Sequence, residues 1–557
     1  MSFIDKITNV VPWKTATGDD QAVDGIRTPA DLRGQFHLDD VHSYLTVNEA
    51  LKTRRDVLQW VDDLRRARAG HIKIEWVALS VVAAKLAQSH HTTMLQGAGA
   101  GLDMRARAKA LLKTGCDLGA SDIDIRRLAG HAVIEVHIDG TILQYDEITT
   151  EYADKLINAL FMLTKQQYRR KQSQDGSIAG RDLMGTGLVN VRLARTPIAP
   201  IDADAQWLNM RLQAGVQKVP AVDALKELKR IAPPPGSLDL ISSGWTEMQA
   251  ELLQTFVLNA TGTIIFTGPP GSGKTHVMHR LSEHIARTRP GQRQAFIEQP
   301  VETILPHAPQ LNILDTLTAK AAGEAYAHRT RLVLRMAVNI LGLGEIRDPL
   351  VATTWLSAAE TGMLMMSTMH TAHPFLAIPR LRDMDPDRLA LPIICDPAII
   401  CGLVGQRLVP ILCDHCALPW DQDDPRLTKM MRDAILTWQR PDWQASNIRR
   451  LGPGCPHCAW KGTARRQVVA EVVDPDETLM ADFIQYGPTL ARHRYHTRSD
   501  SDSTMLEKGM ELVFQGRMDP FDVPLKIERI RSYDFLQRER ERALKGLETM
   551  AFIGGGH

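Results

Sequence analysis

The segment that most constrains the fold is a glycine-rich loop between an apolar run and a helical pattern. Residues 264–267 read Ile-Ile-Phe-Thr, residues 268–275 read Gly-Pro-Pro-Gly-Ser-Gly-Lys-Thr, and a helix is expected from His276. This order matches the G-x-x-x-x-G-K-[ST] phosphate loop in the strand–loop–helix setting that the loop requires. The competing interpretation, a surface turn that happens to contain Lys-Thr, is disfavoured by the flanking strand and helix. The pattern predicts a nucleoside triphosphate site on a parallel α/β sheet.

The positions of this loop have distinct chemical tasks. Its glycines let backbone N–H groups turn towards a phosphate, and the N-terminus of the following helix adds a favourable dipole. Lys274 would reach the β- and γ-phosphates of the nucleotide, and Thr275 would place its hydroxyl on Mg²⁺. The nucleotide-binding residues expected in this segment are Gly268, Pro269, Pro270, Gly271, Ser272, Gly273, Lys274, Thr275 and His276.

Polar residues also follow three apolar runs further along the chain. Glu298 and Glu302 come after Ala-Phe-Ile, and Glu345 comes after Leu-Gly-Leu-Gly. A carboxylate at such a strand end, beside a phosphate loop, holds Mg²⁺ or activates water. His370 ends the run Met-Leu-Met-Met-Ser-Thr-Met. Alone it would more often be a structural histidine, but within this series we interpret it as functional.

Four of the seven cysteines form two C-x-x-C pairs separated by 38 residues, namely Cys413, Cys416, Cys455 and Cys458. Such pairs supply four thiolates at the spacing of a closed structural Zn²⁺ site. Four unconnected buried cysteines are the alternative, which needs a double coincidence. His415 and His457, inside the two pairs, are interpreted as bystanders.

The composition limits the classes of protein. At 557 residues, two to four domains are expected. The net charge of +1 gives no electrostatic reason to expect nucleic acid as a partner. No signal peptide is recognised at the N-terminus, and no apolar run reaches the ~18 residues of a membrane span. We therefore expect a cytoplasmic protein.

The chain divides into five regions by pattern. Helical patterns are expected from Leu51 to Leu64 and from Trp76 to Leu86, and one helix from Pro524 to Lys545. Asp139-Gly140 after an apolar run predicts a β-hairpin. The expected regions are an N-terminal arm with a helical part that could dock a partner (1–102), an α+β domain (103–212), a linker with one short helix (213–245), a nucleotide domain with a cysteine insert at 410–465 and C-terminal helices (246–525), and a helical tail (526–557).

These motifs together resemble the family of type II secretion and type IV pilus assembly ATPases. Residues 268–275 match its phosphate loop, and residues 297–302 its acidic box, usually Ile-Glu-Asp-Pro-Val-Glu. Residues 344–348 match its Walker B motif, and residues 367–371 its His box. The resemblance extends from about residue 103 to about residue 525.

The sequence departs from the family pattern in three places. Gln299 stands where the family usually has Asp, which removes a carboxylate near the metal. Pro270 replaces a usual Thr. The segment between Pro197 and Arg211 is longer than usual and lacks the expected Gly-Glu.

The resemblance implies a RecA-like ATPase domain preceded by a PAS-like α+β domain, assembled as a homohexamer. Arg192 and Arg211 of the α+β domain would then reach the γ-phosphate. Glu345 would polarise the attacking water, Glu298 would help to hold Mg²⁺, and His370 would sense the γ-phosphate. The implied partners are an inner-membrane platform protein and other pilus or secretion components.

Three other functions stay open. A pilus retraction or type IV secretion traffic ATPase is one, although such relatives typically lack the cysteine module. A nucleotide-binding scaffold with little turnover is another, because of Gln299. A nucleic-acid translocase has no support from charge or aromatic–basic clusters. The secretion or pilus system that is served, and the partner of residues 1–102, are not predicted.

Overall fold

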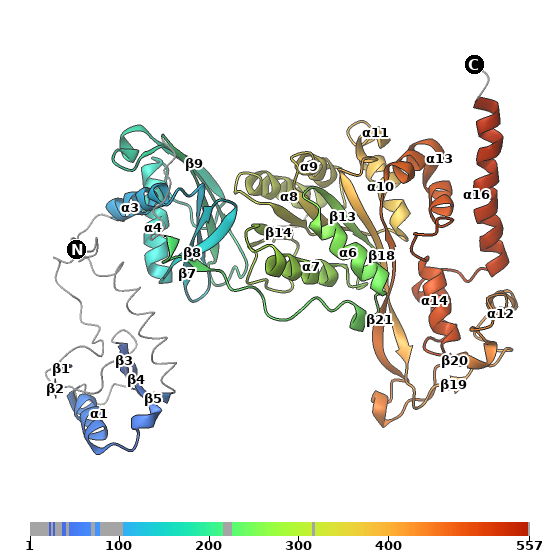
Figure 1. Ribbon diagram of the computed structural model, residues 1–557, viewed down its shortest axis with the longest axis horizontal. Coiled ribbons are helices and arrows are strands. Elements are labelled where there is room, and N and C mark those ends of the chain that lie inside the picture. The colour runs from blue at the N-terminus through green and yellow to red at the C-terminus, as the bar shows by residue number, and fades with distance from the viewer. Residues whose placement is uncertain are drawn as a thin grey trace.

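The computed structural model describes residues 22–23, 26–27, 36–39, 44–67, 73–77, 104–215, 225–314 and 318–554. An α+β domain, a larger α/β domain and a set of C-terminal helices follow one another along the molecule (Figure 1). Within the described residues, no helix combines the length and the apolar character needed to cross a bilayer.

The N-terminal unit is a small α/β unit. Strand β4 (Tyr44–Asn48) pairs with β3 (Phe36–Asp39) in antiparallel fashion and with β5 (Lys73–Val77) in parallel. Helix α1 (Arg55–Ala67) makes the crossover that a parallel pair requires. The expectation of a second helix over 76–86 is wrong at its start, which lies in β5, and its remainder lies outside the described residues. A two-strand ribbon also precedes this unit, formed by β1 (Ala22–Val23) and β2 (Ile26–Arg27).

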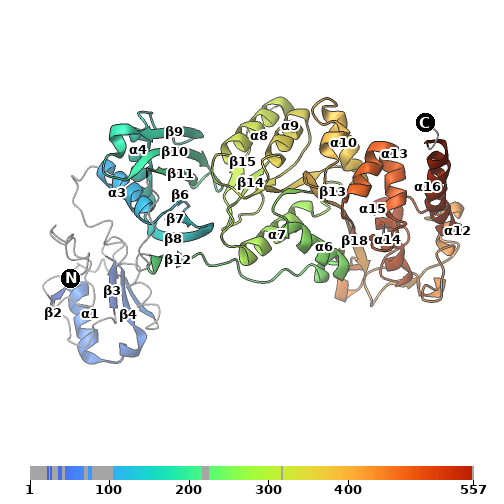
Figure 2. The ribbon, with the colours of Figure 1, turned by 45° about the horizontal axis from the view of Figure 1, so that its top comes forward.

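The α+β domain has one antiparallel sheet with helices on one face. Helices α3 (Met104–Asp117) and α4 (Thr150–Leu163) lie against the sheet (Figure 2). The expected hairpin is confirmed, with left-handed φ values of 49° at Asp139 and 74° at Gly140. The strands, in sheet order, are β12 (Lys229–Arg230), β8 (Thr141–Ile148), β7 (Ala132–Ile138), β6 (Asp122–Arg127), β11 (Gln206–Ala214), β10 (Leu188–Pro197) and β9 (Gln174–Ala179).

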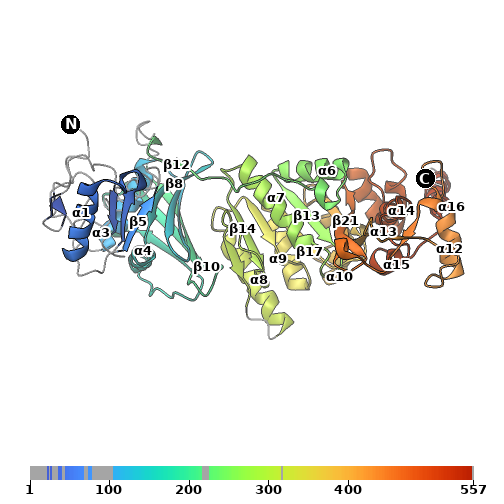
Figure 3. The ribbon, with the colours of Figure 1, turned by 90° about the horizontal axis from the view of Figure 1, so that it is seen from below.

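The α/β domain has the predicted parallel sheet. Helices α6 (Glu247–Leu258) and α7 (Lys274–Thr288) cover one face, and α8 (Ala319–Val333) and α9 (Pro349–Ala359) cover the other (Figure 3). The last strand pairs in antiparallel fashion. In sheet order the strands are β15 (Gln310–Asn312), β14 (Gln294–Glu298), β16 (Ile340–Leu343), β17 (Leu364–Met369), β13 (Gly262–Thr267), β18 (Ile400–Leu412) and β21 (Thr463–Val473).

The helices after β21 differ from the prediction at one point. Residues 524–545 do not form one helix: α15 (Asp522–Lys526) ends before residues 527–532, and α16 (Tyr533–Gly554) begins after them. Ile530 is buried between the two, so tertiary packing holds the break. The remaining α-helices and strands are α10 (Ala377–Met384), α11 (Leu391–Ile394), β19 (Leu418–Pro419), α12 (Lys429–Leu436), β20 (Arg449–Arg450), α13 (Glu477–Tyr495) and α14 (Met505–Phe514).

A buried charge cluster joins the α+β domain to the α/β domain. Arg293, just before β14, is 3% exposed, and its Nη2 donates to Asp124 at 2.8 Å and to Glu135. Burial favours the neutral acid, yet the Arg293 charge lowers the pKa of Asp124 well below its usual value. The backbone N–H of Ala199 also donates to Gln310 in β15 at 2.8 Å. The α+β sheet therefore packs on the edge of the sheet that carries β14 and β15.

Candidate functional site

The phosphate loop connects β13 to α7 and has the backbone shape that its glycines allow. Gly271 and Gly273 have φ values of 73° and 88°, in the left-handed region that disfavours other residues. The Nζ of Lys274 lies over the loop and donates to the carbonyls of Gly268 at 2.9 Å and Pro269 at 3.0 Å. The Oγ of Ser272 is buried and has no partner among the described residues. A buried free donor and a closely held ammonium fit a phosphate group.

A hollow of about 420 Å³ lies beside this loop at the carboxyl edge of the sheet. Ligands bind at this edge in open α/β sheets because strand ends and helix N-termini converge there. Of the predicted nucleotide residues, Gly268 and Pro269 do not line the hollow, although they hold Lys274. The hollow is lined by Pro270, Gly271, Ser272, Gly273, Lys274, Thr275, His276, Glu298, Gln299, Pro300, Glu302, Tyr326, Gly344, Glu345, Arg347, Thr368 and His370.

Glu345 and His370 are brought together by the order of the strands. Strands β16 and β17 are neighbours, and β17 in turn lies beside β13. His370, after β17, therefore lies between the residues that follow β16 and β13. Its Nε2 lies 3.4 Å from Oε1 of Glu345, and its Nδ1 lies 3.1 Å from the carbonyl of Gly268. This arrangement connects an acid that can accept a proton to the loop that would hold the phosphates.

Glu298 and Glu302 both line the hollow but differ in their surroundings. Glu298 is buried, and its two oxygens lie 2.7 Å from His279 Nε2 and 2.8 Å from Gln310 Nε2. Glu302 is exposed. The carboxylate of Glu298 is therefore oriented by two neighbours, and each oxygen keeps a second lone pair that can accept from a metal-bound water.

Three side chains at the site were given no role from the sequence, although one of them, Arg347, lies within the Walker B match. Tyr326, 2% exposed, forms one wall, and burial raises its pKa above the usual value. Gln406 Nε2 donates to the carbonyl of Ser272 at 2.6 Å and so supports the loop. Arg347 lies beside both Gln299 and Tyr326. None of the three belongs to the phosphate loop, the acidic residues or the histidine that the pattern selects.

Arg192 and Arg211 lie elsewhere. They are directly opposite each other on β10 and β11, and both are exposed on the α+β domain. Arg211 pairs with Asp122 at 3.1 Å. Neither lines the hollow within this chain.

The charge of Lys274 predicts a proton linkage. Burial lowers its pKa to about 8, although Glu345 opposes this. Phosphates favour the ammonium form, so at pH 8 Mg²⁺-ATP binding is expected to take up about half a proton, against almost none near pH 6.5. Isothermal titration calorimetry in two buffers of different ionisation enthalpy measures this uptake. Lys274→Arg is the control, because a guanidinium does not titrate there, and the same uptake in this variant would contradict the assignment.

The two cysteine pairs meet at the far end of a two-strand ribbon. Strand β18 runs directly into Cys413, while β21 begins shortly after Cys458, and these strands pair side by side. The Sγ atoms are 3.8 Å apart for Cys413–Cys455 and for Cys416–Cys458, and all four lie within 4.8 Å of one another. Four sulfurs at about 2.3 Å from a tetrahedral Zn²⁺ are about 3.8 Å apart, so this donor set fits the ion.

The sheet and the glycine-rich loop indicate the class of protein, and a family model identifies the family. A parallel α/β sheet with a strand–glycine-rich loop–helix unit, and with an acid at a nearby strand end, is typical of phosphate-loop nucleotide-binding proteins. Residues 104–532 match the model of the Type II/IV secretion system protein family. The chain belongs to this family.

Curated relatives carry related names. One is the type IV pilus assembly ATPase PilB of Thermus thermophilus, 26% identical over 398 residues, which are 71% of this chain and 40% of that protein. Another is the putative type II secretion system protein E of Escherichia coli K12, 27% identical over 372 residues, or 66% of each chain. The crystal structure of the pilus retraction motor PilT with bound ADP covers 74% of this chain and 94% of its own, at 19% identity and a TM-score of 0.35.

Proposed function

We propose that this chain is a hexameric motor that hydrolyses ATP to drive assembly of a pilus or pseudopilus. The observation that carries the proposal is the contact of His370 with both Glu345 and the phosphate loop. Membership of the secretion family supports the coupling to a pilus or secretion machine. The motor would act at the cytoplasmic face of the inner membrane, against a platform protein, with no nucleic-acid partner.

The residues around the hollow divide the chemistry among them. Lys274 and the backbone N–H groups of the loop would bind the phosphates, and Thr275 with Glu298 would hold Mg²⁺, which neutralises charge on the phosphate oxygens. Glu345 would polarise the attacking water, since it is at the sheet edge facing the loop. His370 would report the γ-phosphate to Glu345 by shifting between its two partners.

Arg192 and Arg211 would take their proposed role in a different arrangement from the one within this single chain. Their mutual position, side by side on one exposed sheet face, supports a shared anionic ligand. Because they do not line the hollow of their own chain, they would contact a nucleotide after a movement of the α+β domain or in a ring. We also propose that the α/β domain is RecA-like, that the α+β domain is PAS-like, and that residues 1–102 dock a partner.

Two alternatives would use the same nucleotide site. A retraction or traffic motor would use the same hollow, but the four cysteines favour the assembly branch of the family. A nucleotide-binding scaffold with little turnover is favoured only by Gln299, which lines the hollow in place of an acid.

Steady-state turnover of Mg²⁺-ATP by the purified oligomer tests the proposal. We expect turnover that requires Mg²⁺ and that disappears in Lys274→Ala, because removal of this charge weakens phosphate binding. Lys320→Ala, an exposed lysine of α8, is the matched control and should turn over normally. ATP binding without turnover in the wild-type oligomer, even with its membrane partner, would support the scaffold.

A further inference from the structure

Arg347 occupies a particular position in the nucleotide hollow. It follows Glu345 by two residues, and within the described part of the chain it is the one arginine that lines this hollow. Its guanidinium lies 5.8 Å from the ring centre of Tyr326, and its Nη2 donates to Oε1 of Gln299. Two neighbouring side chains therefore orient this cation towards the site.

The partners of Arg347 leave its charge largely uncompensated. Gln299 is neutral, so the hydrogen bond fixes the direction of the guanidinium and does not cancel its charge. The carboxylate of Asp348 lies 4.0 Å from Nε, at the outer limit of an ion pair. The oxygen at this distance is Oδ2, which makes no hydrogen bond to Arg347, while Oδ1 accepts from the N–H of Val351 at 3.0 Å and holds the carboxylate at the start of helix α9. An Asp at position 299 would instead form an ion pair with Arg347.

We propose that Arg347 supplies, from the same chain, a positive charge to the terminal phosphate of ATP, and that Gln299 positions it without neutralising it. This inference rests on the proposed ATPase function. In phosphoryl transfer the charge is spread over the terminal phosphate oxygens, and a planar guanidinium with several donors stabilises it well. With Gln in place of Asp at position 299, the site loses one negative charge and the positive charge of Arg347 stays available to the phosphate. The site is therefore not disabled by Gln299.

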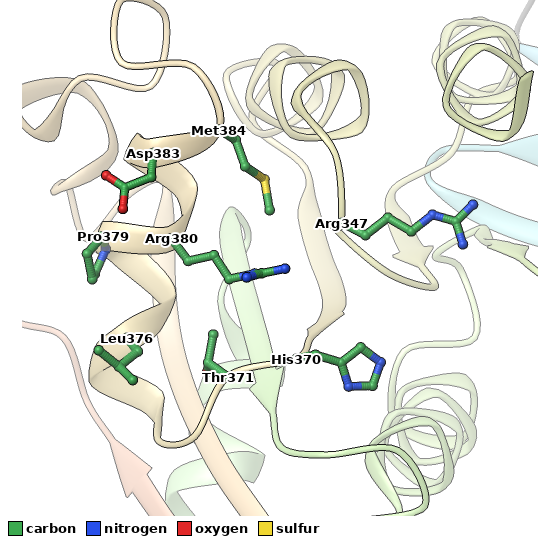
Figure 4. A pocket seen from close by; sticks show the side chains of 8 residues that line it. All are labelled: Arg347, His370, Thr371, Leu376, Pro379, Arg380, Asp383 and Met384. Atoms are coloured by element: carbon green, nitrogen blue, oxygen red, sulfur yellow. The ribbon is translucent and has the colours of Figure 1, made fainter. Parts of the chain in front are cut away.

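The structure also offers a matched control. A second hollow, of about 450 Å³, lies on the other side of Arg347 and His370 and is lined by Arg380 of α10 (Figure 4). In Figure 4 the side chain of Arg347 extends away from Arg380. Arg380 is exposed and does not line the nucleotide hollow. Removing Arg380 therefore deletes a nearby arginine without altering the proposed phosphate contact.

The test compares turnover and nucleotide binding in Arg347→Ala, Arg347→Lys and Arg380→Ala. For Arg347→Ala, kcat is expected to fall by about 100-fold or more, as for loss of one donor to a transition state, while KM changes by less than about threefold. Its affinity for ADP should be kept, and its preference for ADP–beryllium fluoride over ADP should be lost. Arg347→Lys should recover part of kcat, and Arg380→Ala should match the wild type.

Gln299→Glu tests the role of the neutral partner, because it adds a charge at nearly constant shape. It should lower kcat by about tenfold by holding Arg347 in an ion pair, with no further loss when combined with Arg347→Ala. If Arg347→Ala keeps the wild-type kcat, the inference about Arg347 is wrong, while the proposed ATPase function stands. The same holds if Arg347→Ala loses ADP affinity as strongly as kcat and also has a lower Tm, because the residue would then serve folding. A wild-type protein with neither turnover nor a preference for ADP–beryllium fluoride would overturn the proposed function as well.

Discussion

Glu345→Gln is expected to abolish turnover of Mg²⁺-ATP while leaving ATP binding within a few-fold of the wild type. An amide cannot take a proton from water, and loss of a general base costs about 100- to 10,000-fold in rate. The variant keeps the size of the side chain, and its amide can either accept from or donate to His370, whose Nε2 lies 3.4 Å from Oε1 of Glu345. The geometry of the hollow should therefore survive.

The control for this variant makes the same chemical change outside the site. Glu360→Gln alters an exposed acid at the end of helix α9, and its turnover should equal that of the wild type. Single-turnover kinetics and ATP affinity should be measured on both variants. Retained turnover in Glu345→Gln would mean that another group activates water. A parallel loss of ATP affinity would mean that Glu345 serves binding or folding.

Replacing Cys413 and Cys455 together by Ser is expected to remove zinc and lower the melting temperature. Zinc contributes on the order of 10 kcal/mol to the folding of small metal domains. Losing even about 3 kcal/mol would lower Tm by roughly 6–12 °C in a domain of this size. The phosphate loop lies beside Gly405 and Gln406 in the middle of β18 and does not contact the cysteine cluster, so nucleotide affinity should change little.

The matched control replaces two buried cysteines outside the cluster, Cys395 and Cys401. Zinc content, measured by atomic emission on the purified proteins, should stay near one ion per chain in this control and fall to near zero in the Cys413/Cys455 variant. Full zinc content and unchanged melting in the latter variant would show that the four sulfurs do not hold a structural ion.

The elements that were predicted correctly are those with a strong local pattern. The strand before Gly268 and the helix after it follow from the apolar run and the glycine-rich loop. The hairpin at Asp139-Gly140 follows from the left-handed backbone that this dipeptide accepts. One of the two errors lies where the pattern is short: residues 73–77 alternate as a strand, yet Trp76 also fits a helical period. The other, the break in the helix expected over 524–545, is set by packing around Ile530.

At the site, the sequence identifies candidate residues but not their contacts. The sequence names Glu345, His370 and the four cysteines as candidates, because their residue types and spacing limit the chemistry that they can do. It does not place His370 beside Glu345, since that contact depends on β17 lying between β16 and β13.

The charges around the site were decided by tertiary structure. The pairing of Arg347 with Gln299 joins residues 48 positions apart, and that of Arg293 with Asp124 joins residues 169 positions apart. By itself the sequence determined the phosphate loop, the cysteine pairs and the alternation of strands and helices, because these depend on neighbouring residues. Only the tertiary structure decided which buried or half-buried charges meet, because strand order and domain packing set those distances, and local spacing does not record them.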